Sequence, residues 1–365
     1  MKLPAIDALR GIAALGVAWF HSRVDLWVGF REIQANPASY SWIDGKTSWL
    51  SLPASQMSGM VMLFFVLSGF CIHLPTVGKN RMPNWKAYAV RRFFRIYPAY
   101  LGTLLVSFGL ALALSKKITY EEINVYAASV ALLQNCLFEG QQISINPSLW
   151  SIPVEAEFYV VYPLLIWISL RFGYPGAILF TLLCTGCGGI LFFSGFDHPN
   201  GNFFKYALLW NSGAWLAERY AGSGLPKWSF FHAIALLIGI AVTLFASFAG
   251  VNTFYLHYGW GFCSLLVLWW ALGPGARYFV PSKWWVQLLV FLGMISYSVY
   301  LLHFPLFRLA GAAWVSLYGS KPDSFFIPTL ATALIVPIAW MFYKFIERPS
   351  QEFGQRLARQ LERGF

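Results

Sequence analysis

Three ionisable residues lie in the first apolar segment of the chain: Asp7 and Arg10 near its start, and His21 near its end. Ionisable groups are expensive inside a bilayer, and those found there usually have a function or a partner. On a helix, the eleven residues from Arg10 to His21 rise by about 16 Å, so the guanidinium and the imidazole lie at two depths. A catalytic or binding role is one interpretation of these groups. The alternative is structural: Arg10 pairs with Asp7 or reaches the interface, and His21 is an interfacial side chain.

A second candidate group is the pair Arg92 and Arg95, in the basic run at 79–95. Spacing of three on a helix puts both guanidinium groups on one face, where they form a fork suited to phosphate oxygens. Anchoring is the alternative, because Lys and Arg gather at the cytoplasmic ends of spans. Both interpretations place this run on the cytoplasmic side.

A carboxylate, Glu155, enters a later apolar segment from the opposite side, within the stretch 148–159. We expect it at a depth similar to that of His21, where it can orient an imidazole that acts as a general base. The alternative is an anion that favours a helix start through the macrodipole. Ser68 and His303 lie inside other apolar segments, where such groups commonly only hydrogen-bond to neighbouring helices.

The composition identifies the class of protein. The chain is 58% hydrophobic and only 11% charged, which is typical of a polytopic membrane protein and not of a soluble domain of 365 residues. The first segment is interrupted by Asp7 and Arg10, so we interpret it as mature structure and not as a signal peptide. The net charge of +11 is spread between apolar runs, which argues for orientation in a bilayer and against nucleic-acid binding.

Runs long enough to cross a bilayer predict about ten transmembrane helices. They lie at 5–24, 57–76, 94–114, 152–171, 175–194, 203–219, 230–249, 254–273, 286–307 and 325–345.

The segment at 119–149 carries several polar side chains, and we predict a re-entrant or interfacial structure for it. Ten spans put both termini and the basic run at 79–95 in the cytoplasm, as the distribution of Lys and Arg requires. The fold class is therefore an all-α polytopic membrane protein with a single integral domain over 1–365. Residues 346–365 form a short basic cytoplasmic tail.

Together these segments resemble the acyltransferase-3 family of integral membrane acyltransferases, almost over the whole chain. The resemblance rests most on Arg10, His21 and the Arg92/Arg95 pair with their spacing. Weaker segments support it at 64–70, 150–159, 296–303 and 346–349.

The resemblance implies acetyl-CoA-dependent O-acetylation of a carbohydrate, typically a bacterial surface polysaccharide such as lipopolysaccharide O-antigen or exopolysaccharide. Arg92 and Arg95, with Arg10, would hold the CoA phosphates, and His21 would act as general base, oriented by Glu155. We group Asp7 with the catalytic residues. Substrate-binding candidates are Trp150, Tyr159, His303 and Ser68.

The expected partners are acetyl-CoA, a glycan or lipid-linked sugar acceptor, and the lipid bilayer of the bacterial inner membrane. An acyl-histidine intermediate remains an alternative to direct attack. A transporter would also bury polar residues between helices, and a non-catalytic glycan-binding scaffold is a third possibility. We expect no metal site, because Cys184 and Cys187 form a C-x-x-C without a second ligand pair.

Overall fold

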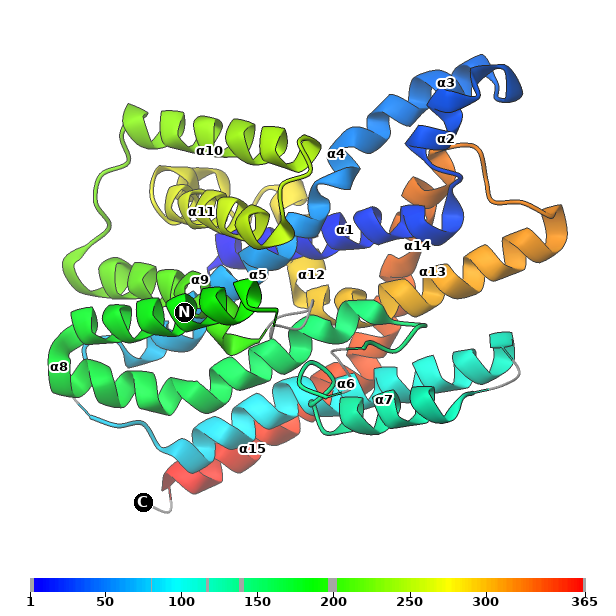
Figure 1. Ribbon diagram of the computed structural model, residues 1–365. Helices are drawn as coiled ribbons and strands as arrows, with labels where there is room; N and C mark the ends of the chain where they lie inside the picture. Colours follow the sequence, from blue (N-terminus) through cyan, green and yellow to red (C-terminus); the bar gives the residue numbers. More distant parts are fainter. Residues whose placement is uncertain (1–2, 80, 116–117, 138–140, 196–201, 364–365) are drawn as a thin grey trace.

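The computed structural model describes residues 3–79, 81–115, 118–137, 141–195 and 202–363, and their regular structure is helical (Figure 1). Helix α1 (Pro4–Leu26) lies inside the bundle. It packs most closely against α12 (Trp284–Met294) and α13 (Ser296–Tyr318), and it also contacts α5 (Met60–His73), α11 (Thr253–Leu272) and α14 (Phe326–Phe342). The small side chains of α1 make this central position possible, since Ala8, Ala13 and Ala18 are fully buried.

The other helices surround this centre. They are α2 (Phe30–Ala35), α3 (Trp42–Thr47), α4 (Ser51–Ser55), α6 (Trp85–Ser115), α7 (Tyr120–Val130), α8 (Ser151–Phe193), α9 (Phe203–Glu218), α10 (Phe230–Phe248) and α15 (Arg348–Arg363). Short 3-10 or π-helical turns lie between them: η1 (Pro37–Ser39), η2 (Ser48–Leu50), η3 (Met57–Gly59), η4 (Leu74–Thr76), η6 (Pro147–Trp150), η7 (Arg219–Ser223), η8 (Pro274–Tyr278) and η9 (Tyr343–Glu347).

Six helical stretches of the described chain are long and apolar enough to cross a membrane, so the predicted count of about ten is not confirmed. The difference has physical causes. Helix α9 has 16 residues and α12 has 11, which are short for a span. The two runs predicted at 152–171 and 175–194 form one helical stretch, α8, which is broken at Gly173 (φ 72°) and turns back there (Figure 1).

Helix α10 shows most directly that the molecule belongs in a bilayer. It lies at the edge of the bundle against α11 (Figure 1), and Thr243 is its only buried residue. Large apolar side chains such as Phe231 (78% exposed) and Phe245 (76% exposed) cover the rest. An apolar helix exposed in this way is unfavourable in water and suits a lipid environment.

The segment predicted to be re-entrant or interfacial contains α7, which packs beside α6. Eleven helical residues extend about 16 Å, roughly half the hydrocarbon thickness, so α7 cannot cross the membrane alone. Residues 138–140 of this segment lie outside the described residues.

The connections fall on two sides of the bundle. The link between α5 and α6, the reversal of α8 and the C-terminal end lie towards the left of Figure 1. The tip formed by α2 and α3, the C-terminal end of α6 and the α13–α14 connection lie towards the right. The basic run at 79–95 and the end of the chain are therefore on the same side.

The predicted basic tail is largely helix α15, which packs along α6 as Figure 1 shows. Arg91 pairs with Glu362 at 2.7 Å, and a Cβ on Gly354 would lie 2.4 Å from the Cβ of Phe94. The tail is thus a docked element of the fold. Residues 364–365 lie outside the described residues.

Three prolines create docking points between helices. A proline has no N–H, so the carbonyl four residues earlier loses its helical donor. Pro98, Pro163 and Pro305 leave three carbonyls in this position, and each accepts a side-chain hydrogen bond from elsewhere in the chain. These bonds are Ser350 Oγ to Phe94 O (2.7 Å), Tyr88 OH to Tyr159 O (3.3 Å) and Asn146 Nδ2 to Leu301 O (2.8 Å).

Helices α5 and α9 approach closely at Gly69 of α5 and Gly213 of α9. A Cβ built on Gly69 would lie 1.9 Å from the carbonyl oxygen of Trp210, whereas one on Gly109 meets nothing within 4 Å. We expect Gly69→Ala to lower the stability of the purified protein by about 1–3 kcal/mol, because the helices must separate. Gly109→Ala is the matched control and should be neutral or slightly stabilising. Thermal melting in detergent compares the two, and equal melting temperatures would contradict this packing.

Candidate active site

A cavity of about 210 Å³ lies between α1, α5, α6, α8 and α13. Most of its polar lining was predicted as functional: Arg10, Ser68, Arg92, Arg95, Glu155 and Tyr159. Charged and polar side chains from these helices thus meet in one cavity, together with the apolar side chains that complete its lining.

The arginines reach this cavity from two helices. Arg92 and Arg95 lie one turn apart on α6, and Arg10 comes from α1, where it pairs with Asp7 at 3.5 Å. The guanidinium carbon of Arg92 lies 5.5 Å from the ring centroid of Tyr88 and 5.4 Å from that of Tyr159. Its Nε is buried, and within the described chain no group accepts a hydrogen bond from it. These features leave donors in place for an anionic ligand.

Glu155 lies in the same cavity as the arginines. Its Oε1 accepts hydrogen bonds from Tyr159 OH (2.5 Å) and Ser68 Oγ (3.5 Å), and Trp210 Nε1 donates to Ser68 Oγ (3.3 Å). In the described part of the chain these hydrogen bonds join Glu155 to Tyr159 and Ser68, while His21 bonds to His303; we had expected Glu155 to orient the imidazole of His21. Three guanidinium groups and one carboxylate line the cavity, and Asp7 beside Arg10 and Glu347 near Arg95 offset part of this positive charge.

His21 makes its hydrogen bond to another helix. Its Nδ1 lies 2.9 Å from Nε2 of His303 on α13, and it is not among the residues that line the cavity. His303 is 0% exposed, and its Nδ1 lies 2.7 Å from the carbonyl oxygen of Tyr300. Both ring nitrogens of His303 therefore have protein partners, which differs from the substrate contact that we expected.

Tyr300 connects the histidine pair to the cavity. Its side chain lines the cavity and bonds to Ser151 Oγ at 2.7 Å, while its carbonyl holds His303. Sequence reasoning did not select Tyr300, although it lies within the segment at 296–303 that carries the resemblance. Trp150, a candidate for substrate binding, packs against Tyr206 and His257, with ring centroids 5.8 and 6.4 Å away.

A second residue was missed near the arginines. Glu347 is 3% exposed and accepts hydrogen bonds from Ser298 Oγ (2.5 Å) and Gln351 Nε2 (2.8 Å). It interacts electrostatically with Arg95, as does Glu155. Its place in the segment at 346–349 was the available signal, but the basic character of the tail drew attention away from a single carboxylate.

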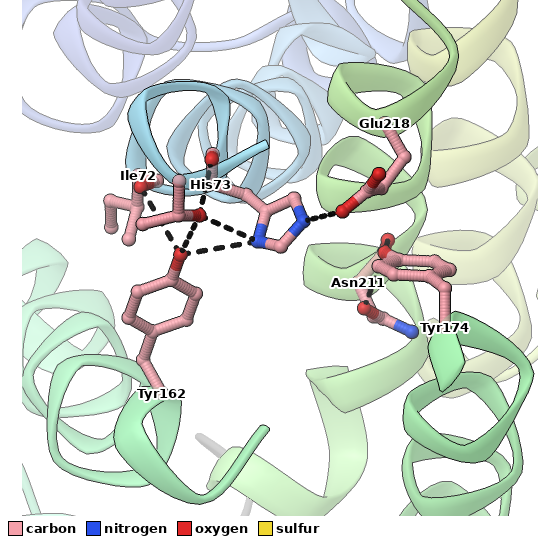
Figure 2. A network of polar contacts seen from close by, with 7 residues as sticks. Ile72, His73, Tyr162, Tyr174, Asn211 and Glu218 are labelled. Carbon is pink, nitrogen blue, oxygen red and sulfur yellow. Dashed lines mark hydrogen bonds and ion pairs between the residues drawn. The ribbon is translucent and has the colours of Figure 1, made fainter. Parts of the chain in front are cut away.

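A separate polar network supports the wall that carries Ser68 (Figure 2). His73, at the end of α5, has Nε2 2.6 Å from a carboxylate oxygen of Glu218 on α9 and Nδ1 3.1 Å from Tyr162 OH on α8. Tyr162 packs edge-on against Trp210, the donor to Ser68. The network ties α5, α8 and α9 together behind the cavity.

This geometry combines a cavity lined by three arginines with a histidine that is hydrogen-bonded to a second histidine. The sequence profile of a family described as "Acyltransferase domain" matches residues 3–344, which is nearly the whole chain. The chain belongs to the acyltransferase-3 family. The resemblance identified from the sequence is thereby confirmed.

Two of the proteins to which the chain is similar are named as O-acetyltransferases. The chain is 25% identical to O-acetyltransferase OatA of Staphylococcus aureus strain NCTC 8325 / PS 47, over 96% of this chain and 58% of that protein. It is 23% identical to a putative O-acetyltransferase of Staphylococcus aureus strain COL, with the same coverage of each. The chain thus spans 58% of the length of these relatives. A comparison with solved structures finds no significant match.

The matching family model is named for acyltransferase activity, which implies an acyl donor for members of the family. Over the residues that the structure describes, no three His, Cys, Asp or Glu side chains are grouped to hold a metal ion.

Proposed function

We propose that this chain is a membrane-embedded O-acyltransferase that moves an acetyl group from cytoplasmic acetyl-CoA to a hydroxyl of an extracytoplasmic glycan. The observation that carries the proposal is the convergence of Arg10, Arg92 and Arg95 on one cavity, while His21 lies farther along the same helix as Arg10. Lipopolysaccharide O-antigen or an exopolysaccharide is the acceptor class that we expect.

The arginines bind the donor in this proposal. Guanidinium groups recognise phosphate oxygens in pairs, and CoA carries several phosphates. The cavity receives a phosphate of CoA or the start of the pantetheine arm. Asp7 and Glu155 hold the arginines in position, which replaces the role that we first expected for Glu155. The arm extends past Tyr300 towards His21.

His21 performs the proton transfer. Its unprotonated nitrogen takes the proton of the acceptor hydroxyl as that oxygen attacks the thioester carbonyl. A carbon–oxygen bond forms, the carbon–sulfur bond breaks, and the departing thiolate of CoA takes the proton from His21. In the alternative mechanism the acetyl group is first transferred to His21, which forms an acyl-histidine intermediate, and then to the acceptor hydroxyl.

The orientation follows from charge. The side that holds the basic run at 79–95 and the end of the chain faces the cytoplasm of a bacterial inner membrane, in accordance with the positive-inside rule. Acetyl-CoA then arrives on the side of the arginines, and the glycan arrives from the other.

The test uses the full chain in inside-out membrane vesicles supplied with radiolabelled acetyl-CoA. We expect alkali-labile label on glycan inside the vesicles, and none when an equal amount of labelled acetate replaces acetyl-CoA. Uptake of solute without ester formation would support the transporter alternative instead. Vesicles from cells without the chain are the control, and equal labelling in them would reject the proposal.

A further inference from the structure

The ring nitrogens of His21 and His303 form a chain of hydrogen bonds whose direction can be determined by counting protons. The chain begins at the backbone carbonyl of Tyr300, which lies 2.7 Å from His303 Nδ1. A carbonyl oxygen only accepts, so Nδ1 of His303 carries a proton. In a neutral imidazole the other nitrogen, Nε2, then has a free lone pair.

That lone pair determines the state of His21. His303 Nε2 lies 2.9 Å from His21 Nδ1, and a hydrogen bond between them needs one proton. Since Nε2 of neutral His303 has none, the proton is on Nδ1 of His21. The interplanar angle of 20° between the rings lets this N–H point nearly in the plane of the accepting ring. Neutral His21 therefore has its lone pair on Nε2.

The burial of His303 maintains the direction of these two hydrogen bonds, from His21 to His303 and from His303 to the Tyr300 carbonyl. His303 is 0% exposed and is surrounded by aromatic rings, with Phe304 5.9 Å and Phe307 6.1 Å away between centroids. Water cannot readily replace the Tyr300 carbonyl or the ring of His21 as a partner. Reversal would leave a buried nitrogen without a hydrogen bond, which is unfavourable by about 1–3 kcal/mol.

We infer that His303 is a positioning residue, which fixes the Nδ1–H tautomer of His21 and so presents His21 Nε2 as the base. The catalytic part of this inference rests on the function proposed above. When Nε2 takes a proton from the acceptor hydroxyl, the Nδ1 proton remains bonded to His303, which stabilises the imidazolium of His21. The proton then returns from His21 Nε2 to the leaving thiolate, so the pair ends unchanged.

The direct test is ¹⁵N NMR of the full chain with labelled histidine, in detergent or nanodiscs, with His21 assigned by comparison with His21→Ala. We expect a protonated Nδ1 and an unprotonated Nε2 for His21 in the wild type. In His303→Leu the two tautomers should mix. In His303→Gln the side-chain carbonyl can accept from Nδ1, so the wild-type pattern should return.

Activity provides the second readout. Acyl transfer should fall about 10–100-fold in His303→Leu, less than on removal of the base itself, and recover in His303→Gln to within about threefold of wild type. Donor binding should not change in either variant. A protonated Nε2 on wild-type His21, or an unchanged tautomer in His303→Leu, would overturn the inference.

The spectra distinguish this inference from the proposed function. The expected tautomer in a chain that transfers no acyl group would contradict the function and leave the role of His303 on His21 intact. If acyl transfer depends on His21 but His21 has the opposite tautomer, the proposed function stands and the role of His303 is contradicted.

Discussion

His21→Ala is expected to reduce acyl transfer by about 10²–10⁴-fold, the range that general-base catalysis contributes. The reason is the loss of the only histidine that both lies on the same helix as Arg10 and is hydrogen-bonded to another imidazole in the described structure. The measurement is the rate of label transfer from acetyl-CoA to glycan, with equal amounts of folded protein. Acetyl-CoA binding should remain, because His21 does not line the arginine cavity.

His232→Ala is the matched control for this variant. His232 lies at the start of α10 and contacts Ser229 at 2.7 Å, away from the cavity and the histidine pair. It should keep nearly all the activity. A His21→Ala protein that transfers acetyl at the wild-type rate would remove His21 from the mechanism, whatever the control shows.

The double variant Arg92→Ala/Arg95→Ala is expected to weaken acetyl-CoA binding by about 10²-fold or more. Each hydrogen bond to a charged group contributes about 1.5–3 kcal/mol, and both side chains lie in the cavity. Titration calorimetry with a non-hydrolysable thioether analogue of acetyl-CoA measures the change. Activity at saturating donor should recover in part, because the histidine pair is intact.

Arg91→Ala provides the control on the same helix. Arg91 is an immediate neighbour of Arg92, but it pairs at the surface with Glu362, with side-chain exposures of 36% and 44%. Exposed ion pairs contribute little to stability, about 0–1 kcal/mol. Donor binding should be unchanged in this variant. Equal loss in Arg91→Ala and in the double variant would indicate a general effect of positive charge and not a specific site.

The arginine cavity was predictable in part because helical spacing is a local property. A spacing of three residues from Arg92 to Arg95 is enough to put both on one face, and the structure brings them together with Arg10. The partner of His21 was not predictable in this way. Hydropathy gives the depth of a residue along the membrane normal, and it does not say which helices are neighbours. Glu155 was matched to His21 by depth, but α8 directs it to the arginines.

The number of spans was harder to predict than the helical class. Apolar composition alone indicates a membrane protein, since little else explains a helix such as α10. Counting spans requires the length of each helix, and that depends on breaks such as Gly173 and on short helices such as α12. The docking of α15 also escaped prediction, because its charged composition is equally compatible with a solvated tail.

The three carbonyls freed by Pro98, Pro163 and Pro305 have a consequence for how the walls of the cavity are aligned. In lipid the hydrophobic effect scarcely distinguishes one sliding position of two apolar helices from another, because every register buries similar surfaces. A carbonyl that has no helical donor does distinguish these positions, because it receives its hydrogen bond from the neighbouring segment at one position only. Helices α6, α8 and α13 each contain one such carbonyl. The three prolines thus restrict how far these helices can shift along their axes, and with them the relative depths of the arginines, of Glu155 and of the histidine pair in the membrane.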